Sequence, residues 1–219
     1  MRGFRFLTFD CYGTLIDWRT GIELSLKSAF GGFPLQGRAL LDAYVLEEKK
    51  EEESYKKYRE VLRNTAVRLA KSAHLEADQS AADEFANSVP SWPAFPDTRK
   101  ALRELGKMGF ARYILSNVDT DLLEGTIRNS GLEVDGFVTA EQVGSYKPSR
   151  GHWVAFMRKT GARKREVLHV AQSLYHDILP TQEMGIASAW VNRYREPLPE
   201  SAHPAYIVDS LESLTNLLR

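Results

Sequence analysis

The stretch FRFLTFDCYGTL, residues 4–15, joins a short apolar run to a polar turn. Residues 4–10 are apolar and aromatic and end in turn chemistry, a pattern that is typical of a buried strand. Gly13 permits backbone angles that other residues avoid, and the backbone N–H groups of a tight turn can cradle an anion. The sequence therefore predicts that Asp10 lies at the end of a buried strand, where a carboxylate can attack a substrate and form a covalent ester.

Further short apolar segments have the same character, and helical patterns separate them. The strands expected in addition to the first are 111–116, 167–171, 186–192 and 205–208. The helices expected between and after them are 97–109, 121–130, 149–160, 177–184 and 209–218. Because strands and helices alternate, the sequence predicts an α/β fold with a mainly parallel sheet.

Residues 18–92 interrupt this alternation with a long, polar segment that has helical character. The segment ends at the proline-rich stretch SVPSWPAFPD, residues 88–97, which is typical of a boundary. Within it, EEKKEEESYKKYRE, residues 47–60, carries charges of both signs three or four residues apart. We interpret this run as the solvated face of a helix.

The composition restricts the function classes. The chain has 219 residues and a formal net charge of zero, so it lacks the overall basic charge of many nucleic-acid-binding proteins. Cys11 is the sole cysteine and cannot form an internal disulfide, which fits a reducing compartment. The sequence has no apolar run long enough to span a membrane, and its N-terminus resembles a first strand rather than a signal peptide. We therefore expect a cytoplasmic protein without nucleic-acid or membrane partners.

Polar residues follow several of the predicted strands. Asp10 ends the first strand, Ser116 and Asn117 end the second, Lys147 follows the short segment GFVTA, and Asp177 follows 167–171. Ligands of open parallel sheets bind outside the carboxyl ends of the strands. We therefore expect these side chains to meet in one crevice, with the helical segment 18–92 placed over it.

The motifs FDCYGTL, LSN, SYKP and QSLYHD occur in the order of the four motifs of the haloacid dehalogenase superfamily, and the chain resembles that family. The resemblance implies a Rossmann-like catalytic core, residues 1–17 and 93–219, with a helical cap, residues 18–92. It implies that Asp10 is the nucleophile and that Thr14 helps to bind the substrate anion. Ser116 and Asn117 would orient the substrate, and Lys147 and Asp177 would activate the water that hydrolyses the ester.

Tyr12 distinguishes two branches of this family. The phosphatases resemble DxDGT, in which the second aspartate is a general acid, whereas the 2-haloacid dehalogenases resemble DxYGT, as here. A phenol is a poor acid for an alcohol leaving group at neutral pH, but a halide leaves without a proton. In the fourth motif Gln172 replaces an acid, so Asp10 and Asp177 would bind Mg²⁺ weakly at best.

The resemblance therefore predicts hydrolytic dehalogenation of a short 2-haloacid to a 2-hydroxy acid, with no cofactor and a small molecule as the partner. Tyr12 and Ser173 are further candidate substrate-binding residues, and Arg19 is the favoured cation for the halide, ahead of Arg38, Arg59 and Arg63. The fourth motif lacks the asparagine of the dehalogenase branch, because Leu174 occupies its place. Two alternatives stay open: an Mg²⁺-dependent phosphatase acting on a small phosphomonoester, and a non-catalytic binding protein. A homodimer is also left open.

Overall fold

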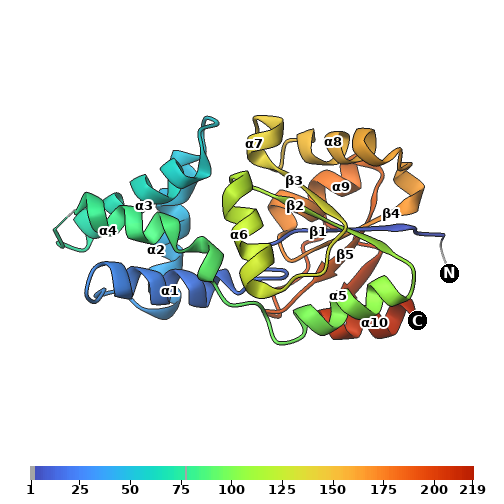
Figure 1. Cartoon of the computed structure of the whole chain (residues 1–219), viewed down its shortest axis with the longest axis horizontal. Helices are drawn as coiled ribbons and strands as arrows, with labels where there is room; N and C mark the ends of the chain where they lie inside the picture. The colour runs from blue at the N-terminus through green and yellow to red at the C-terminus, as the bar shows by residue number, and fades with distance from the viewer. Residues whose placement is uncertain (1–2, 77) are drawn as a thin grey trace.

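The computed structural model describes residues 3–76 and 78–219, and its centre is a six-stranded sheet (Figure 1). The strand order is β3-β2-β1-β4-β5-β6, and every neighbouring pair is parallel. The strands are β1 (Phe6–Phe9), β2 (Ala111–Ser116), β3 (Gly136–Thr139), β4 (Val167–Ala171), β5 (Ala187–Val191) and β6 (Tyr206–Val208). The predicted parallel α/β sheet is confirmed. Strand β3 was not predicted as a strand, because the sequence analysis described it only as a short segment.

The register of the sheet places Asp10 at its centre. Phe9, the last residue of β1, pairs with Ile114 on one side and Val170 on the other. Strand β1 is buried at Leu7, Thr8 and Phe9, because a central strand of a parallel sheet is covered on both faces. Asp10 therefore leaves the sheet between the carboxyl ends of β2 and β4.

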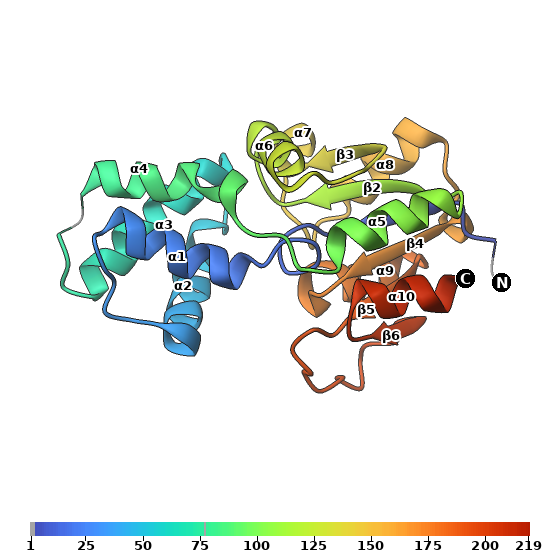
Figure 2. The same ribbon diagram turned by 60° about the horizontal axis from the view of Figure 1, so that its bottom comes forward.

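Helices cover both faces of the sheet (Figures 1 and 2). Helices α5 (Thr98–Lys107) and α10 (Leu211–Leu218) lie on one face, and α8 (Gly151–Thr160) and α9 (Leu179–Met184) lie on the other. The other connections include α6 (Thr120–Ser130), α7 (Ala140–Val143) and the 3₁₀ turn η2 (Lys164–Glu166). A π-helical turn, η3 (Leu174–Ile178), leads from β4 into α9.

Four helices between β1 and α5 lie together at the end of the sheet (Figures 1 and 2). They are α1 (Trp18–Ala29), α2 (Gly37–Glu51), α3 (Tyr58–Ser72) and α4 (Gln79–Asn87), and the 3₁₀ turn η1 (Val89–Ser91) follows them. Residues 1, 2 and 77, which the predicted core and cap ranges include, lie outside the described residues. One apolar core joins these helices to the sheet, since Phe9 of β1 belongs to the same cluster as Tyr44 of α2 and Phe85 of α4.

The chain enters and leaves the four helices through two segments that lie side by side. The backbone N–H of Asp17 donates to the carbonyl of Pro93 at 2.8 Å, and that of Phe95 donates to Leu15 at 3.1 Å. Ile16 also forms an antiparallel bridge with Ala94. These contacts tie the two crossing segments into a short two-stranded connection.

The charge run 47–60 is solvated only in part, because Lys49, Lys50 and Glu53 are exposed but Glu51 is not. Glu51 is buried, at 5 % exposure, and accepts hydrogen bonds from Lys56, Asn64 and Arg68. These contacts offset the cost of its burial and lower its pKa to about 2. The mixed-charge pattern is consistent with the helical ends of the run, where α2 ends at Glu51 and α3 begins at Tyr58, but it does not indicate which carboxylates face inward.

Among the residues described, none of the helices combines the length and the apolar content that crossing a membrane requires.

Candidate active site

Asp10 is held in place through both of its carboxylate oxygens. The Thr14 hydroxyl donates to Oδ2 at 2.9 Å, and the Lys147 ammonium donates to Oδ1 at 2.8 Å. Thr14 is fully buried, and its oxygen also accepts from the backbone N–H of Gln172 at 2.9 Å. The hydroxyl of Thr14 thus faces Asp10, and its contacts orient the carboxylate rather than line the cavity in front of it.

Lys147 joins the two aspartates of the site. Its ammonium donates to Asp10, to Asp177 Oδ1 at 2.7 Å and to the carbonyl of Leu115 at 3.0 Å, so all three of its protons are used. The side chain of Asn117 fixes the lysine from behind, because it donates to the Lys147 carbonyl at 3.0 Å and accepts from the Lys147 N–H at 2.6 Å. Hydrogen bonds therefore connect the second predicted motif, at Asn117, with the third, at Lys147.

Asp177 has a second buried partner, His169 of β4. The Nε2–H of His169 donates to Asp177 Oδ1 at 2.9 Å, and Nδ1 lies 2.9 Å from the hydroxyl of Thr8. Within the described part of the chain, Asp177 Oδ2 has no hydrogen-bond partner. His169 was not among the residues predicted for the site, so its contact with Asp177 is an addition from the structure.

Burial and charge give the two aspartates different acidities. Burial raises the pKa of Asp10, and the nearby Asp177 raises it further, although Lys147 works in the opposite direction. Burial also disfavours the charged form of Asp177, but Lys147 and the hydrogen bond from His169 lower its pKa well below the usual range. The pKa of Lys147 is raised by the two carboxylates despite its burial. Asp177 and Lys147 therefore form the firm ion pair, and Asp10 is the more basic carboxylate.

Ser116 ends β2 beside Asp10 and is completely buried. Its carbonyl accepts from His152 Nε2 at 3.0 Å, and burial lowers the pKa of that histidine to about 4, so it is neutral at neutral pH. No described residue hydrogen-bonds with the hydroxyl of Ser116. A buried hydroxyl without a partner is costly, so this group is available to a ligand.

Tyr12 donates its hydroxyl proton to Thr126. The Thr126 hydroxyl donates to the carbonyl of Leu122 at 3.0 Å, so it accepts from the Tyr12 hydroxyl, which lies 2.9 Å away. Burial raises the pKa of Tyr12 well above its usual value. The phenol is thus a neutral group whose proton points away from Asp10, and its ring packs edge-on against Trp92.

The fourth motif forms the turn at the end of β4. Ser173 accepts from the backbone N–H of His176 at 3.0 Å and contacts its Nδ1 at 3.2 Å. Burial lowers the pKa of His176, so it is not a cation at neutral pH. The carbonyl of Gln172 accepts from Trp190 Nε1 at 2.8 Å. Ser173 thus caps the π-helical turn that carries Asp177 into the site.

A cavity of about 250 Å³ opens in front of these residues. We call its two sides the sheet half and the helical half. The sheet half is lined by Asp10, Tyr12, Ser116, Asn117, Val118, Lys147, Gln172, Ser173, His176 and Asp177. The helical half is lined by Trp18, Ile22, Tyr44, Val45, Glu48, Glu52, Tyr58 and Trp92. The predicted convergence of the four motifs on one crevice is thus seen in the structure, and the carboxylates of Glu48 and Glu52 are an addition that sequence reasoning missed.

Arg19 is not brought to the cavity. Its guanidinium lies 3.3 Å from the centre of the Tyr194 ring and 3.6 Å from a Glu196 oxygen. The other three arginines considered for the halide pair with acids elsewhere: Arg38 with Asp42, Arg59 with Asp121 and Arg63 with Asp83. In residues 3–76 and 78–219, Lys147 is the one lysine or arginine that lines the cavity.

The donors at the site suit a metal ion poorly. The described residues contain no group of three or more His, Cys, Asp or Glu side chains placed to hold one. Both oxygens of Asp10 and one of Asp177 already accept hydrogen bonds, and the Lys147 ammonium lies between the two carboxylates. Mg²⁺ requires several hard oxygen ligands in octahedral geometry.

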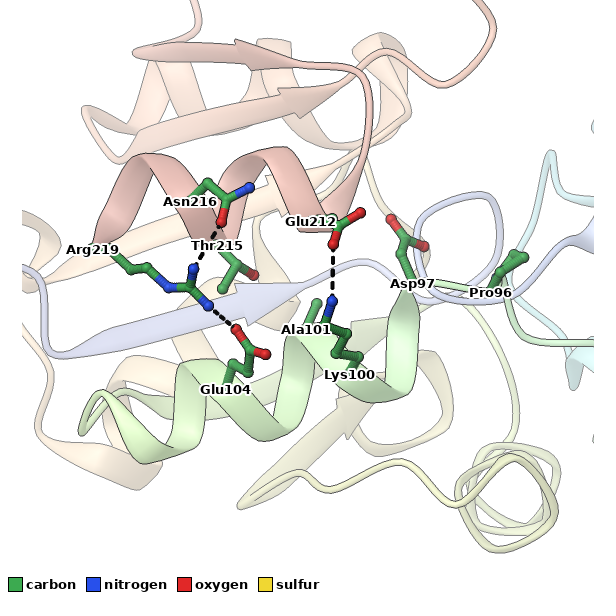
Figure 3. Close-up of a pocket in the computed structure, with 9 residues that line it drawn as sticks. All are labelled: Pro96, Asp97, Lys100, Ala101, Glu104, Glu212, Thr215, Asn216 and Arg219. Carbon is green, nitrogen blue, oxygen red and sulfur yellow. Dashed lines mark hydrogen bonds and ion pairs between the residues drawn. The ribbon is translucent and has the colours of Figure 1, made fainter.

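A second cavity, of about 260 Å³, lies between α5 and α10 (Figure 3). Its charged side chains are paired: Lys100 donates to Glu212 at 3.0 Å, and Arg219 donates to Glu104 (Figure 3). Asp97 accepts from Arg193 at 3.0 Å. The pairs Lys100–Glu212 and Arg219–Glu104 link α5 to α10, so the charged side chains of this cavity have structural partners.

Known proteins resemble this chain in sequence and in fold. Haloacetate dehalogenase H-2 of Moraxella sp. strain B is 24% identical over 230 residues, which cover 100% of this chain and 99% of that protein. A pyrimidine 5'-nucleotidase of Escherichia coli strain K12 is 31% identical over 121 residues, 54% of this chain and 52% of that protein. The fold matches the L-2-haloacid dehalogenase of Xanthobacter autotrophicus with chloropropionic acid covalently bound, with a TM-score of 0.85 at 21% identity over 99% of this chain and 98% of that one.

The description of the matching family is a haloacid dehalogenase-like hydrolase, and the match spans residues 4–185. That range includes the strand end at Asp10, the loops at Ser116 and Lys147, and the turn at Asp177. The chain therefore belongs to the family of haloacid dehalogenase-like hydrolases.

Proposed function

We propose that the protein hydrolyses a short 2-haloacid to the 2-hydroxy acid through a covalent ester on Asp10, without a metal ion. The observation that carries the proposal is the environment of Asp10: Thr14 and Lys147 fix its carboxylate, while the proton of Tyr12 is committed to Thr126. This arrangement supplies a nucleophile but no acid for an alcohol leaving group. A halide needs none, because it leaves with the electron pair of the carbon–halogen bond.

In the first step, an oxygen of Asp10 attacks C2 of the haloacid, the carbon–halogen bond breaks and the halide departs. The unpartnered hydroxyl of Ser116 donates to the substrate carboxylate and holds C2 in line. Burial favours this step, since a carboxylate with a raised pKa has lost part of its stabilising hydration.

In the second step, water attacks the carbonyl carbon of the ester, and the 2-hydroxy acid leaves from Asp10. Asp177 Oδ2, which has no partner among the described residues, accepts a hydrogen bond and then a proton from this water. His169 and Lys147 hold Asp177 at its other oxygen and fix its orientation. The bond between the ester carbonyl carbon and the alkyl oxygen then breaks, the proton on Asp177 passes to the departing alkoxide to give the 2-hydroxy acid, and the second proton of the water is released to solvent, which restores the carboxylate of Asp10.

The decisive experiment is a single turnover in H₂¹⁸O with enzyme in excess over each enantiomer of 2-chloropropionate. The covalent path places ¹⁸O in the Asp10 carboxylate and leaves the first product unlabelled, whereas direct attack by water labels the product at once. Halide release should survive EDTA and disappear in Asp10→Asn. The matched control is Asp42→Asn, an exposed aspartate paired with Arg38 and remote from the cavity, which should keep full activity.

Two results would replace the proposal. Cleavage of p-nitrophenyl phosphate that needs Mg²⁺, without halide release, would assign the site to phosphoester hydrolysis. A folded protein that turns over neither substrate would leave a binding function.

A further inference from the structure

The helical half of the cavity presents two carboxylates that the proposed chemistry does not use. Glu48 lies in the last turn of α2, and Glu52, four residues later, directly follows the helix, with its backbone N–H donating to the carbonyl of Glu48 at 3.0 Å. Both side chains line the cavity. The hydroxyls of Tyr44 and Tyr58 both donate to Glu48 Oε1, at 2.9 and 2.6 Å. These two hydrogen bonds fix Glu48 in the wall of the cavity.

The charges that line the cavity are out of balance. Four acidic side chains, Asp10, Asp177, Glu48 and Glu52, face one cationic side chain among the described residues, Lys147. Both aspartates already use Lys147 as their partner. Burial raises the pKa of Glu48 and, with the proximity of Glu48, raises that of Glu52 to about 8. The two glutamates therefore lack a cation that would favour their charged forms.

Aromatic side chains line the same half of the cavity as the two glutamates. Trp18, Tyr44, Tyr58 and Trp92 line this half of the cavity, and the rings of Trp18 and Tyr44 are 6.3 Å apart. The faces of aromatic rings attract cations, and cages of such rings are a common binding site for quaternary ammonium groups. Carboxylates and aromatic faces together are thus suited to an organic cation.

The opposite end of the cavity, in the sheet half, suits a negatively charged group. The Ser116 hydroxyl, which no residue in the described ranges satisfies, can donate a hydrogen bond to a carboxylate. A ligand that extends across the cavity therefore meets a hydrogen-bond donor beside Asp10 and the carboxylates of Glu48 and Glu52 at its other end.

We propose that the helical half of the cavity binds a substituted ammonium group, so that the preferred substrates are 2-haloacids with a cationic substituent. The choice of a haloacid rests on the proposed function, whereas the cation site rests on Glu48, Glu52 and the four aromatic rings. The substrate carboxylate lies beside Ser116, C2 faces Asp10, and the ammonium group lies between the two glutamates.

The test compares 2-bromo-5-(trimethylammonio)pentanoate with its neutral isostere 2-bromo-6,6-dimethylheptanoate, which differ only in the charge of the terminal group. We expect kcat/KM to be at least about tenfold higher for the cation, from one cation–π contact and the attraction of the carboxylates. Glu48→Gln and Glu52→Gln should each reduce this preference. Glu53→Gln removes a neighbouring exposed carboxylate that does not line the cavity, and it should leave the preference unchanged.

Binding is measured in parallel by calorimetry with the unhalogenated pair, 5-(trimethylammonio)pentanoate and 6,6-dimethylheptanoate. Tighter binding of the cation that Glu48→Gln and Glu52→Gln remove supports the cation site, even if no haloacid is hydrolysed and the proposed function fails. Halide release from both bromoacids without preference for the cation, together with equal binding of the unhalogenated pair, overturns the cation site and leaves the proposed function in place.

Discussion

Asp10 and Asp177 share one lysine, and we predict that the same substitution at the two positions changes stability in opposite directions. In the buried set of Asp10, Lys147 and Asp177, two negative charges face one positive charge. Asp10→Asn removes the excess negative charge, and an amide oxygen can still accept from Lys147. Because the fold disfavours the ionised form of Asp10, this variant should be more stable than the wild type, as is common when a functional group is removed.

The magnitudes follow from the partners of each carboxylate. A gain of about 0.5–2 kcal/mol is the usual size of a single stabilising substitution. Asp177 accepts two charge-assisted hydrogen bonds, from Lys147 and His169, each of which contributes about 1.5–3 kcal/mol when charged. Asp177→Asn keeps the geometry but loses the charge, so we expect a loss of about 2–4 kcal/mol. For a protein of this length, each kcal/mol shifts Tm by about 2–4 °C.

The pH dependence supplies an internal check. The raised pKa of Asp10 means that its unfavourable contribution grows as pH rises above the unfolded-state value and is complete at the folded-state value, so the advantage of Asp10→Asn disappears in acid. The lowered pKa of Asp177 means that its contribution is present above the unfolded-state value and is lost as pH falls. In acid, the gain in stability of Asp10→Asn and the loss in stability of Asp177→Asn should therefore both become smaller.

The assay is thermal unfolding followed by calorimetry at pH 7.5 and in acid, for the wild type, both single variants and the double variant. Asp42→Asn is the control for removing an exposed carboxylate. Equal losses of Tm in Asp10→Asn and Asp177→Asn at neutral pH would refute the reasoning, since they would mean that Lys147 stabilises both carboxylates alike.

Three further predictions concern the site and its helical half. Lys147→Met leaves two buried carboxylates without a partner and should cost about 3–5 kcal/mol, measured as a fall in Tm together with loss of halide release; an unchanged Tm would contradict it. Wild-type stability should fall as pH rises toward about 8, because the unfolded chain releases the Glu52 proton at lower pH than the folded protein does, and Tm of Glu52→Gln should be less sensitive to pH in this range; identical profiles would argue against a buried Glu52. Gly21→Ala places a methyl group 2.4 Å from Cγ of Trp92, so it should cost about 1–3 kcal/mol by chemical denaturation; full stability would mean that Trp92 moves freely.

The sheet and the central residues of the site could be predicted because their signals are local. Buried parallel strands read as short apolar runs, and the observed bounds of β2 and β4 equal the predicted ranges 111–116 and 167–171. Convergence of Asp10, Lys147 and Asp177 follows from parallel topology, since the carboxyl ends of all strands meet at one edge. Strand β3 is only Gly136–Thr139, too short a pattern to stand out from a loop.

The helical half of the site was less accessible to sequence reasoning. Glu48 and Glu52 lie within a run of charges, and such a pattern does not state which side of the helix meets the sheet. Arg19 is near Asp10 in sequence, yet helix α1 directs its side chain onto the ring of Tyr194. Both outcomes depend on how distant segments pack, which is a property of the tertiary structure.

The paired crossing segments, residues 15–17 and 93–95, determine which insertions and deletions the fold can tolerate. Because Asp17 and Pro93 are joined by a backbone hydrogen bond, the chain leaves for the four helices and returns from them at one point. A stretch of chain whose ends are neighbours can be lengthened, shortened or exchanged while the remainder keeps its closure. Insertions and deletions in this stretch can therefore remodel the wall that carries Glu48 and Glu52 without moving Asp10, Lys147 or Asp177. Substrate choice and bond-breaking chemistry are thus free to evolve at different rates in one polypeptide.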